Sequence, residues 1–526
     1  MTARRWRSWT AATLGAAVLA ALALLLVAGG SSRAQRASAS DDERRDVVLI
    51  MTDDQTVESM RVMPSTRRLL GDQGTTFAHN FVSYPLCCPS RATLLTGQYA
   101  HNNGVLGNRP PQGGYQKLRP TAGRTLPVWL SRAGYDTVHI GKYLNGYGAA
   151  TPATEVPPGW TEWHGSVDPF TYRMWGYRLN EGGVVRQYGR LRVENPRLYQ
   201  TDVYRDKAVD AIRRRADNGK HLYLSVAFLA PHAESAAGRQ AAPVRSAPRH
   251  RGTFANEPVP RPPSYDEADV SDKPAVLGQA YGRLTPQQQA RIDLSYRSRI
   301  ESLLAVDEAV AAIVDALRDT GRLNRTLIIF TSDNGFFHGE HRIPNGKYLV
   351  YEPSVTVPLI LRGPGIPAGR TSRELVANVD LAATILDAAD ARPRGRTLDG
   401  RSLLPFARRP GRRTDRPILL ETGQTTDSGD LDEDGGPGVR RPGRRIPTYR
   451  AVRTDRFKYV EYSTGDRELY DLARDPDELQ SVHADPAYAR TLAALRRELR
   501  RLRRCAGSVC RRDAGPIPGP SRGNDD

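Results

Sequence analysis

The sequence predicts an α/β fold, with a mixed, mostly parallel sheet sandwiched by helices and a small antiparallel subdomain near the C-terminus. From residue 46 onward, short apolar runs rich in β-branched residues alternate with longer stretches of helical periodicity, which is typical of a parallel sheet covered by helices. Three short apolar runs separated by turn residues follow near the C-terminus. The length of 526 residues exceeds what one hydrophobic core usually serves, so a large domain plus a smaller one is expected.

The large sheet is predicted to contain five clear strands. They cover residues 47–51, 137–140, 222–229, 326–331 and 357–361. A long helix is predicted over residues 286–317, and the run Arg-Asp-Thr-Gly that follows it supplies a stop. Between residues 234 and 274 the chain is rich in Pro, Ala, Arg and Ser without periodicity, so we expect a long surface excursion there.

The C-terminal region is predicted to form an antiparallel meander from residues 449–454, 457–462 and 468–472. A polar insert at residues 425–447 mixes an acidic run with Gly, Pro and Arg, and we expect it to be disordered. The closing helix places Leu492, Leu495, Leu499 and Leu502 on one face. This pattern favours a docked amphipathic helix over a membrane or partner helix.

The N-terminus has the pattern of a signal peptide. Arg4, Arg5 and Arg7 precede an apolar stretch over residues 11–27, and the small residues Ala-Ser-Ala follow at 37–39. We therefore expect export, with the protein secreted or held at the cell surface. The alternative is an uncleaved membrane anchor, because the apolar run approaches spanning length.

The four cysteines fall into two pairs with different expectations. Cys505 and Cys510 close a small loop, and in an exported protein this spacing is compatible with a disulfide. Cys87 and Cys88 are adjacent, and neighbours in sequence rarely satisfy the geometry of a disulfide. The first pair therefore needs another explanation.

The formal net charge of +18 suits polyanionic partners such as sulfated polysaccharide or nucleic acid. Only seven lysines occur in the chain, so an arginine bias of the coding sequence is a competing explanation of the basic surface. The sequence contains no recognisable nucleic-acid-binding motif, so we expect no nucleic-acid partner.

Polar residues recur just past the carboxyl ends of four predicted strands. They are Asp53 and Asp54, then Lys142, then His232, and finally Asp333 and Asn334. Ligands of open α/β sheets bind at this edge, because loops and helix N-termini converge there. The oxygens of the three aspartates and the asparagine suit Ca²⁺, with Mg²⁺ as the alternative, and a divalent cation would relieve their mutual repulsion. For an Asp-Asp pair alone, helix capping or a turn would be the simpler explanation.

Cys87 is predicted to lie at the N-terminus of a helix, because it precedes Pro-Ser-Arg and a helix-like run that ends at Gly97. Anions are stabilised at such a position. A thiol there is often a nucleophile, yet no His or Asn partner follows in the pattern of a cysteine hydrolase. Two buried small apolar side chains are the alternative interpretation of Cys87 and Cys88.

Residues 87–97, CCPSRATLLTG, resemble the C-x-P-S-R-x-x-x-L-T-G signature of the formylglycine-dependent (type I) sulfatase family. The resemblance covers residues 46–472 and is strongest to the N-acetylglucosamine-6-sulfatase branch. Further runs that resemble this branch are GKYLN (141–145), PGW (158–160), TSDNG (331–335), VANVD (376–380) and DGRSLLP (399–405). The resemblance implies an alkaline-phosphatase-like α/β domain with a small C-terminal sheet. It also implies that a separate maturation enzyme converts Cys87 to formylglycine, while Cys88 fills the variable position.

Position by position, the resemblance implies a role for each candidate residue. The metal ligands would be Asp53, Asp54, Asp333, Asn334 and the modified Cys87, and Arg91 would hold the aldehyde hydrate. Lys142, His232 and Lys347 would bind the sulfate group. One hydroxyl of the formylglycine hydrate would attack sulfur, and His232 would protonate the leaving alcohol.

One position departs from the wider family, because many arylsulfatases have a histidine where this chain has Leu144. The base that expels sulfate is therefore open, with Asn145, His338 and His341 as neighbouring candidates. The glucosamine-6-sulfatase branch shares this Lys-Tyr-Leu-Asn form, so the change indicates a subfamily rather than loss of activity.

The sequence as a whole predicts a sulfatase that acts on a sulfate monoester, on a sugar or glycan. The predicted parts are a signal peptide at 1–39, a catalytic domain at 46–410, a C-terminal subdomain at 415–512 and a loose tail at 513–526. The predicted partners are a sulfated small molecule or glycan and the maturation enzyme. Two alternatives remain: a phosphonate monoester or phosphodiester hydrolase of the same superfamily, and a non-catalytic polyanion-binding protein.

Overall fold

The strand that begins at Asp46 shows why the fold is layered. The structure, a computed structural model, describes residues 44–235, 242–423, 426–427 and 445–521. In β1 (Asp46–Thr52), Val48 and Ile50 belong to one hydrophobic core, while Val47 and Leu49 belong to another. Successive side chains of a strand point to opposite faces, so the sheet is covered on both sides.

The large sheet has ten strands among the described residues, in the order β10-β2-β9-β8-β1-β7-β3-β4-β5-β6. The other nine strands are β2 (Thr75–Phe81), β3 (Asp136–Gly141), β4 (Glu162–Ser166), β5 (Tyr177–Glu181), β6 (Val184–Tyr188), β7 (Leu222–Ala227), β8 (Thr326–Ser332), β9 (Leu359–Arg362) and β10 (Arg370–Ala377). The pairs β8–β1, β1–β7, β7–β3, β3–β4 and β10–β2 are parallel. The pairs of β9 and those within β4-β5-β6 are antiparallel.

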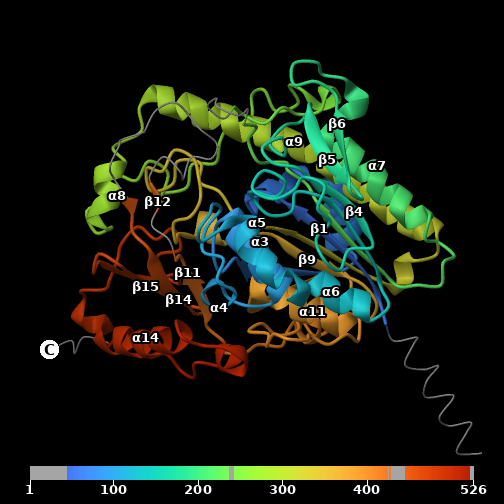
Figure 1. Cartoon of the computed structure of the whole chain (residues 1–526). Coiled ribbons are helices and arrows are strands. Elements are labelled where there is room, and N and C mark those ends of the chain that lie inside the picture. The colour runs from blue at the N-terminus through green and yellow to red at the C-terminus, as the bar shows by residue number, and fades with distance from the viewer. Residues whose placement is uncertain (1–43, 236–241, 424–425, 428–444, 522–526) are drawn as a thin grey trace, which may run out of the picture. The chain divides into compact units, whose positions relative to one another are not determined.

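Helices cover both faces of this sheet (Figure 1). One core contains side chains of α7 (Gln200–Arg213) and α9 (Pro286–Asp319). The other contains side chains of α3 (Cys87–Thr96), α6 (Leu126–Arg132) and α11 (Leu381–Ala388). Shorter helices are α2 (Pro64–Thr66), α4 (Ala100–Asn103), α5 (Gly114–Leu118), α8 (Ala275–Ala280), α10 (Glu352–Val355) and α12 (Leu404–Arg408).

The C-terminal region forms a second, four-stranded antiparallel sheet. Its order is β11-β14-β15-β16, from β11 (Ile418–Glu421), β14 (Tyr449–Arg453), β15 (Phe457–Tyr462) and β16 (Arg467–Asp471). The helix α14 (Ala489–Leu502) packs on β14 and β15 through its leucine face, so the docked interpretation is confirmed. Cys505 and Cys510 form a disulfide just after this helix.

The five predicted strands correspond to β1, β3, β7, β8 and β9, and the predicted long helix corresponds to α9. The long helix begins as its sequence indicates, because Thr285 and Gln288 form a capping box around Pro286. Five further strands of the large sheet were missed, namely β2, β4, β5, β6 and β10, and so was β11 of the small sheet. The residues of β6 are exposed or half-buried and none is fully buried, so this strand has no apolar face to signal it.

Within residues 234–274, the described part has no strand or helix longer than one turn, but it is not only a surface excursion. Val244, Ala247 and Val259 are buried in the core that contains α9. The predicted insert at 425–447 lies mostly outside the described residues, and its two described ends pair as β12 (Thr426–Asp427) and β13 (Arg445–Ile446).

The remaining predictions about the termini are not tested by the structure. The predicted signal peptide lies outside the described residues. Within the described part of the chain, no helix is both long and apolar enough to cross a membrane. The tail from residue 513 is described as far as Ser521, where the backbone N–H donates to the carbonyl of Ala487 at 2.9 Å. The domain boundaries stay a prediction.

Candidate active site

Four neighbouring parallel strands end at the predicted site. β8, β1, β7 and β3 lie side by side in that order. The residues that follow them are Asp333 and Asn334 after β8, Asp53 and Asp54 after β1, His232 beyond β7 and Lys142 after β3. The sheet thus brings together side chains from four distant parts of the sequence, as its parallel topology predicts.

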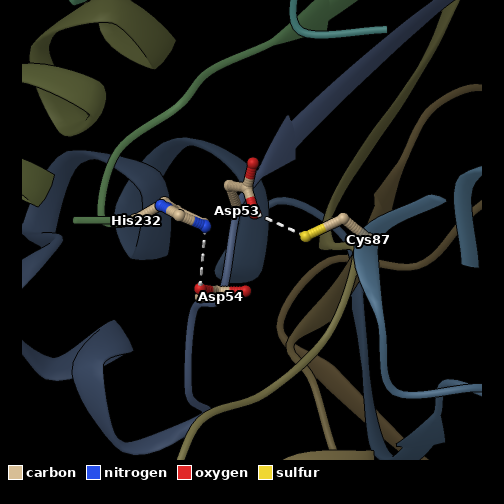
Figure 2. A group of neighbouring side chains, drawn as sticks. All are labelled: Asp53, Asp54, Cys87 and His232. Atoms are coloured by element: carbon tan, nitrogen blue, oxygen red, sulfur yellow. Dashed lines mark hydrogen bonds and ion pairs between the residues drawn. The ribbon is translucent and has the colours of Figure 1, made fainter. Parts of the chain in front are cut away.

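Cys87 enters this edge as the first residue of α3, which ends at Gly97 with φ of 64°. Its buried Sγ lies 3.5 Å from Asp53 Oδ1 (Figure 2). Lys347 Nζ, which the figure does not draw, lies 3.0 Å from the same sulfur. Burial raises the pKa of the Cys87 thiol well above its usual value, and the charge of Asp53 adds to this effect. Cys87 therefore contacts one candidate metal ligand and one candidate sulfate ligand.

Buried carboxylates crowd the ends of β1 and β8. The Asp54 backbone N–H donates to Asp333 Oδ1 at 3.2 Å. Burial raises the pKa of Asp333, and the charge of Asp53 adds to the shift. Burial also acts to raise the pKa of Asp53, but the charges of Lys142, His232 and Arg91 outweigh it and hold this pKa well below its usual value.

The donor set fits a hard divalent cation. Asp54 Oδ2 and Asn334 Oδ1 are buried, and neither has a hydrogen-bond partner among the described residues. One ligand atom from each of Asp53, Asp54, Cys87 and His232 lies within 4.8 Å of the others (Figure 2). Buried oxygens without donors are costly unless a cation or water binds them. The predicted ligands Asp53, Asp54, Asp333, Asn334 and the modified Cys87 therefore suit Ca²⁺ or Mg²⁺.

Arg91, one turn after Cys87 on α3, links the carboxylates of this cluster by hydrogen bonds. Its Nε donates to Asp333 Oδ2 at 2.7 Å, and its Nη2 donates to Asp53 Oδ2 at 3.3 Å. Its Nη1 donates to the Lys142 carbonyl at 2.7 Å. Residues four apart lie on the same face of a helix, so the spacing of Cys87 and Arg91 in the signature places both at the site.

The remaining basic groups lie around the same carboxylates. Lys142 Nζ is 2.5 Å from Asp53 Oδ2, and Lys347 Nζ is 2.6 Å from Asp54 Oδ1. His232 Nε2 is 3.7 Å from Asp54 Oδ2 (Figure 2). All three side chains are almost fully buried. The structure therefore brings together every predicted site residue.

The candidate bases Asn145, His338 and His341 lie in different surroundings, and the His338 ring packs 5.4 Å from the ring of Tyr296 and 5.2 Å from that of Phe336, between ring centroids. Leu144 is buried in the core beside α3 and α6. Asn145 Nδ2 donates to the hydroxyl of Tyr172 at 2.7 Å, whereas His341 Nδ1 is paired with Glu267 Oε2 at 2.6 Å. Asn145 is thus linked to the site through Tyr172, and the base that expels sulfate stays a prediction.

Sequence reasoning missed two residues at the site. The ring of Tyr172 lies against Lys142 and His232. Its centroid is 4.7 Å from Lys142 Nζ and 5.1 Å from the centroid of the His232 ring. Arg299 Nη2, on α9, donates to the Asp54 carbonyl at 2.7 Å. Asp54 has a positive φ of 67°, so Arg299 helps to hold an unusual backbone conformation. Neither residue lies in a recognisable motif. Each comes close to the site only once the chain has folded.

Comparisons with known proteins identify the family of the chain. The family model described as "Sulfatase" matches residues 45–391. The chain belongs to the sulfatase family. A second model, described as "N-sulphoglucosamine sulphohydrolase, C-terminal", matches residues 442–505, the region of the small sheet and α14 of this sulfatase. Family membership makes the protein a sulfuric ester hydrolase.

Among the relatives of this sulfatase, human N-acetylglucosamine-6-sulfatase is 33% identical over 488 residues, which cover 88% of this chain and 85% of the human protein. A solved complex with the substrate D-glucosamine-2-N,6-O-disulfate matches with a TM-score of 0.67 and 24% identity, over 87% of this chain and 97% of that chain. The phosphonate monoester hydrolase of Agrobacterium radiobacter matches with a TM-score of 0.61 and 22% identity, over 88% and 95%. These structural matches confirm the predicted fold alone.

Proposed function

We propose that this sulfatase hydrolyses a sulfate monoester on a sugar, as an N-acetylglucosamine-6-sulfatase does, with Cys87 oxidised to formylglycine and a calcium ion bound. The observation that carries the proposal is the position of Cys87. The first residue of the signature is the first residue of α3, fully buried between Lys347 and Asp53. Once a maturation enzyme has oxidised it, the hydrated aldehyde would present a nucleophilic oxygen where the sulfur now lies.

The metal ligands in this proposal are Asp53, Asp54, Asp333, Asn334 and the modified residue 87. This assignment is supported by two buried oxygens, on Asp54 and Asn334, that lack a hydrogen-bond partner among the described residues. When bound, the cation would polarise the nucleophile and offset charge on the sulfate oxygens. Ca²⁺ is preferred, with Mg²⁺ as the alternative.

Lys142, Lys347 and His232 would bind and neutralise the sulfate group. Lys142 and Lys347 contact opposite members of the Asp53–Asp54 pair, so their charges converge on the space beside Cys87. Preorganised charges of this kind stabilise a transition state, and each is worth about 10²- to 10³-fold in rate. Arg91 would fix the carboxylates and the nucleophile at the same time.

His232 is the proposed acid for the leaving alcohol. Its Nδ1 lies 2.8 Å from the Ala233 carbonyl, which can only accept, so Nδ1 carries a hydrogen. This contact turns Nε2 toward the site, where it faces Asp54 Oδ2 at 3.7 Å. A proton on Nε2 would therefore be held next to a carboxylate and available to the departing oxygen.

The substrate class rests on the relatives. The human relative is named for N-acetylglucosamine 6-sulfate, and the solved complex holds a sulfated glucosamine. The fold does not exclude the alternative of a phosphonate monoester or phosphodiester substrate, because a phosphonate monoester hydrolase shares it. Export is proposed from the N-terminal pattern, and a disulfide such as Cys505–Cys510 persists in an oxidising compartment.

Relative turnover separates these substrates. The protein, coproduced with a formylglycine-generating enzyme, would be assayed with N-acetylglucosamine 6-sulfate, a 4-nitrophenyl sulfate, a phosphodiester and a phosphonate monoester. We expect kcat/KM for the sugar sulfate to exceed that for the phosphodiester by at least about tenfold. A preference for the phosphodiester would overturn the proposal, and binding of heparin without turnover of any ester would favour a polyanion-binding protein.

A further inference from the structure

Tyr172 lies in the loop between β4 and β5, and its ring touches two of the proposed sulfate ligands. Lys142 Nζ is 4.7 Å from the centroid of this ring, and the His232 ring is 5.1 Å away at an interplanar angle of 48°. A cation over an aromatic face is attracted by the ring quadrupole, but Lys142 is also held by its ion pair with Asp53, so its position does not depend on Tyr172 alone. No part of the signature predicts this contact.

Tyr172 differs from the groups it touches in its exposure. Cys87, Lys142, His232 and Lys347 are at most 2% exposed, whereas the Tyr172 side chain is only partly buried. One side of the tyrosine therefore packs against the proposed sulfate ligands while another part of it reaches solvent. Because the proposed sulfate ligands are buried, the alcohol portion of a substrate bound beside Cys87 must extend away from them toward solvent, and Tyr172 is a partly exposed group that touches two of them.

The loop around Tyr172 is held in place from several directions. Buried Gln200, the first residue of α7, donates from Nε2 to the carbonyls of Thr171 and Arg173, both at 2.9 Å. Asn145 donates to the Tyr172 hydroxyl at 2.7 Å. Both neighbouring carbonyls and the phenol oxygen are thus fixed, so the orientation of the ring is set before any ligand binds.

We propose that Tyr172 is a specificity residue of this sulfatase, whose ring forms the wall against which the sugar portion of the substrate packs. The inference rests on the proposed function and adds the surface that recognises the alcohol side of the ester. Sugar-binding sites need apolar surface for the ring as well as polar groups, and a fixed aromatic ring supplies it at low conformational cost. Asn145, which orients the phenol, would act as a positioning residue.

The test uses Tyr172→Leu and Tyr172→Phe in the full, formylglycine-bearing protein. Steady-state kinetics would be measured with N-acetylglucosamine 6-sulfate, and inorganic sulfate would be used as an inhibitor that probes the sulfate ligands without the sugar. For Tyr172→Leu, we expect KM to rise about tenfold, while kcat and the inhibition constant of sulfate change less than about threefold. Tyr172→Phe keeps the ring, so its KM should stay within about twofold of the original.

A matched control is Tyr188→Leu on β6. Tyr188 is also half-buried, and Lys207 Nζ lies 5.5 Å from its ring centroid, but it lies on the edge strand β6, which β4 and β5 separate from β3. Its KM should not change. An unchanged KM in Tyr172→Leu would overturn the inference, and so would an equal rise in KM and in the inhibition constant of sulfate, because Tyr172 would then act only through Lys142 and His232.

Two further outcomes remain informative. Should Tyr172→Leu fail to fold, Tyr172→Phe carries the test, since a KM increase above about fivefold there contradicts packing of the sugar on the ring. If the parent protein, with Tyr172 unchanged, were inactive toward the sugar sulfate but active toward another ester, the proposed sugar substrate itself would be wrong. That result differs from a failure of the Tyr172 inference, which requires an active parent enzyme.

Discussion

Asp380 and Asp54 are both fully buried aspartates, but their oxygens are bound to different extents. Asp380 Oδ1 accepts from Arg416 Nη1 at 2.8 Å and from the Arg401 N–H at 2.9 Å. Its Oδ2 accepts from Arg416 Nη2 at 2.6 Å and from the Ala377 N–H at 3.0 Å. Asp54 Oδ1 is bound by Lys347 and Asn334, whereas its Oδ2 has no hydrogen-bond partner among the described residues.

This difference is the one expected between a structural carboxylate and the carboxylate of a proposed metal ligand. Burial alone would raise the pKa of Asp380, but the Arg416 guanidinium outweighs it and lowers this pKa, so the carboxylate is stable without a ligand. Asp54 also has a positive φ of 67°, whereas Asp380 has a φ of −81°. Strain and incomplete hydrogen bonding at the same residue are typical of a functional site.

The largest expected effect is the loss of activity on changing Cys87. Cys87→Ala removes the proposed nucleophile, and we expect kcat/KM to fall by at least about 10⁴-fold while the melting temperature changes little. Cys88→Ala is the matched control, since it is an adjacent buried cysteine at the variable position, and it should remain active. Comparable losses in the two variants would contradict the assignment of Cys87.

Asp380→Asn tests whether the buried pair of Asp380 and Arg416 stabilises the fold. The change leaves Arg416, which is 2% exposed, without the carboxylate that accepts from both of its Nη groups. We expect the free energy of unfolding to fall by about 3 kcal/mol, measured by denaturant titration. The activity of the folded fraction should be retained, and a loss of less than about 1 kcal/mol would show that the pair is not a major structural contact.

Asp54→Asn tests whether the Asp54 carboxylate binds the proposed cation. Calcium at about 100 times its dissociation constant should stabilise the parent protein by about 2.7 kcal/mol, measured as a rise in melting temperature. Asn adopts positive φ readily, so Asp54→Asn should keep the fold but lose this calcium-dependent rise. Asp380→Asn should keep the rise. If Asp54→Asn retained it as well, the cation would bind elsewhere or not at all.

His139 adds a smaller, pH-dependent test, because it is a buried group kept neutral. Burial lowers the pKa of His139 to about 3, and the Arg91 charge acts in the same direction. Between about pH 3 and 6.5 the unfolded chain binds more protons at this site than the folded chain, so stability falls as the pH falls. We expect His139 to lower the free energy of unfolding by about 1.4 kcal/mol for each pH unit below pH 6.5.

His139→Phe removes this titration and keeps an aromatic ring beside Trp163, whose ring centroid is 4.7 Å from that of His139. The stability difference between the two proteins should therefore shift in favour of the variant as the pH falls from 7 to 5, measured by denaturant titration. Parallel pH profiles would show that His139 does not titrate as expected.

The sequence predicted most of the site because its signals are local. Strand ends and the spacing of Cys87 and Arg91 are read along the chain, and the parallel sheet then brings them together. Tyr172 and Arg299 could not be predicted, since each reaches the site from a segment with no motif and through contacts distant in sequence. The exposed edge strand β6 was missed because tertiary pairing, not an apolar pattern, forms it.

The central claim is that Cys87 becomes formylglycine, and mass spectrometry of one tryptic peptide tests it most directly. Cleavage after Arg68 and Arg91 releases residues 69–91, which contain both Cys87 and Cys88. In protein from its native host, we predict that this peptide has lost one sulfur and two hydrogens and gained one oxygen, with the change at residue 87 and an intact thiol at residue 88. A fully thiol-bearing Cys87 in active protein would contradict the account.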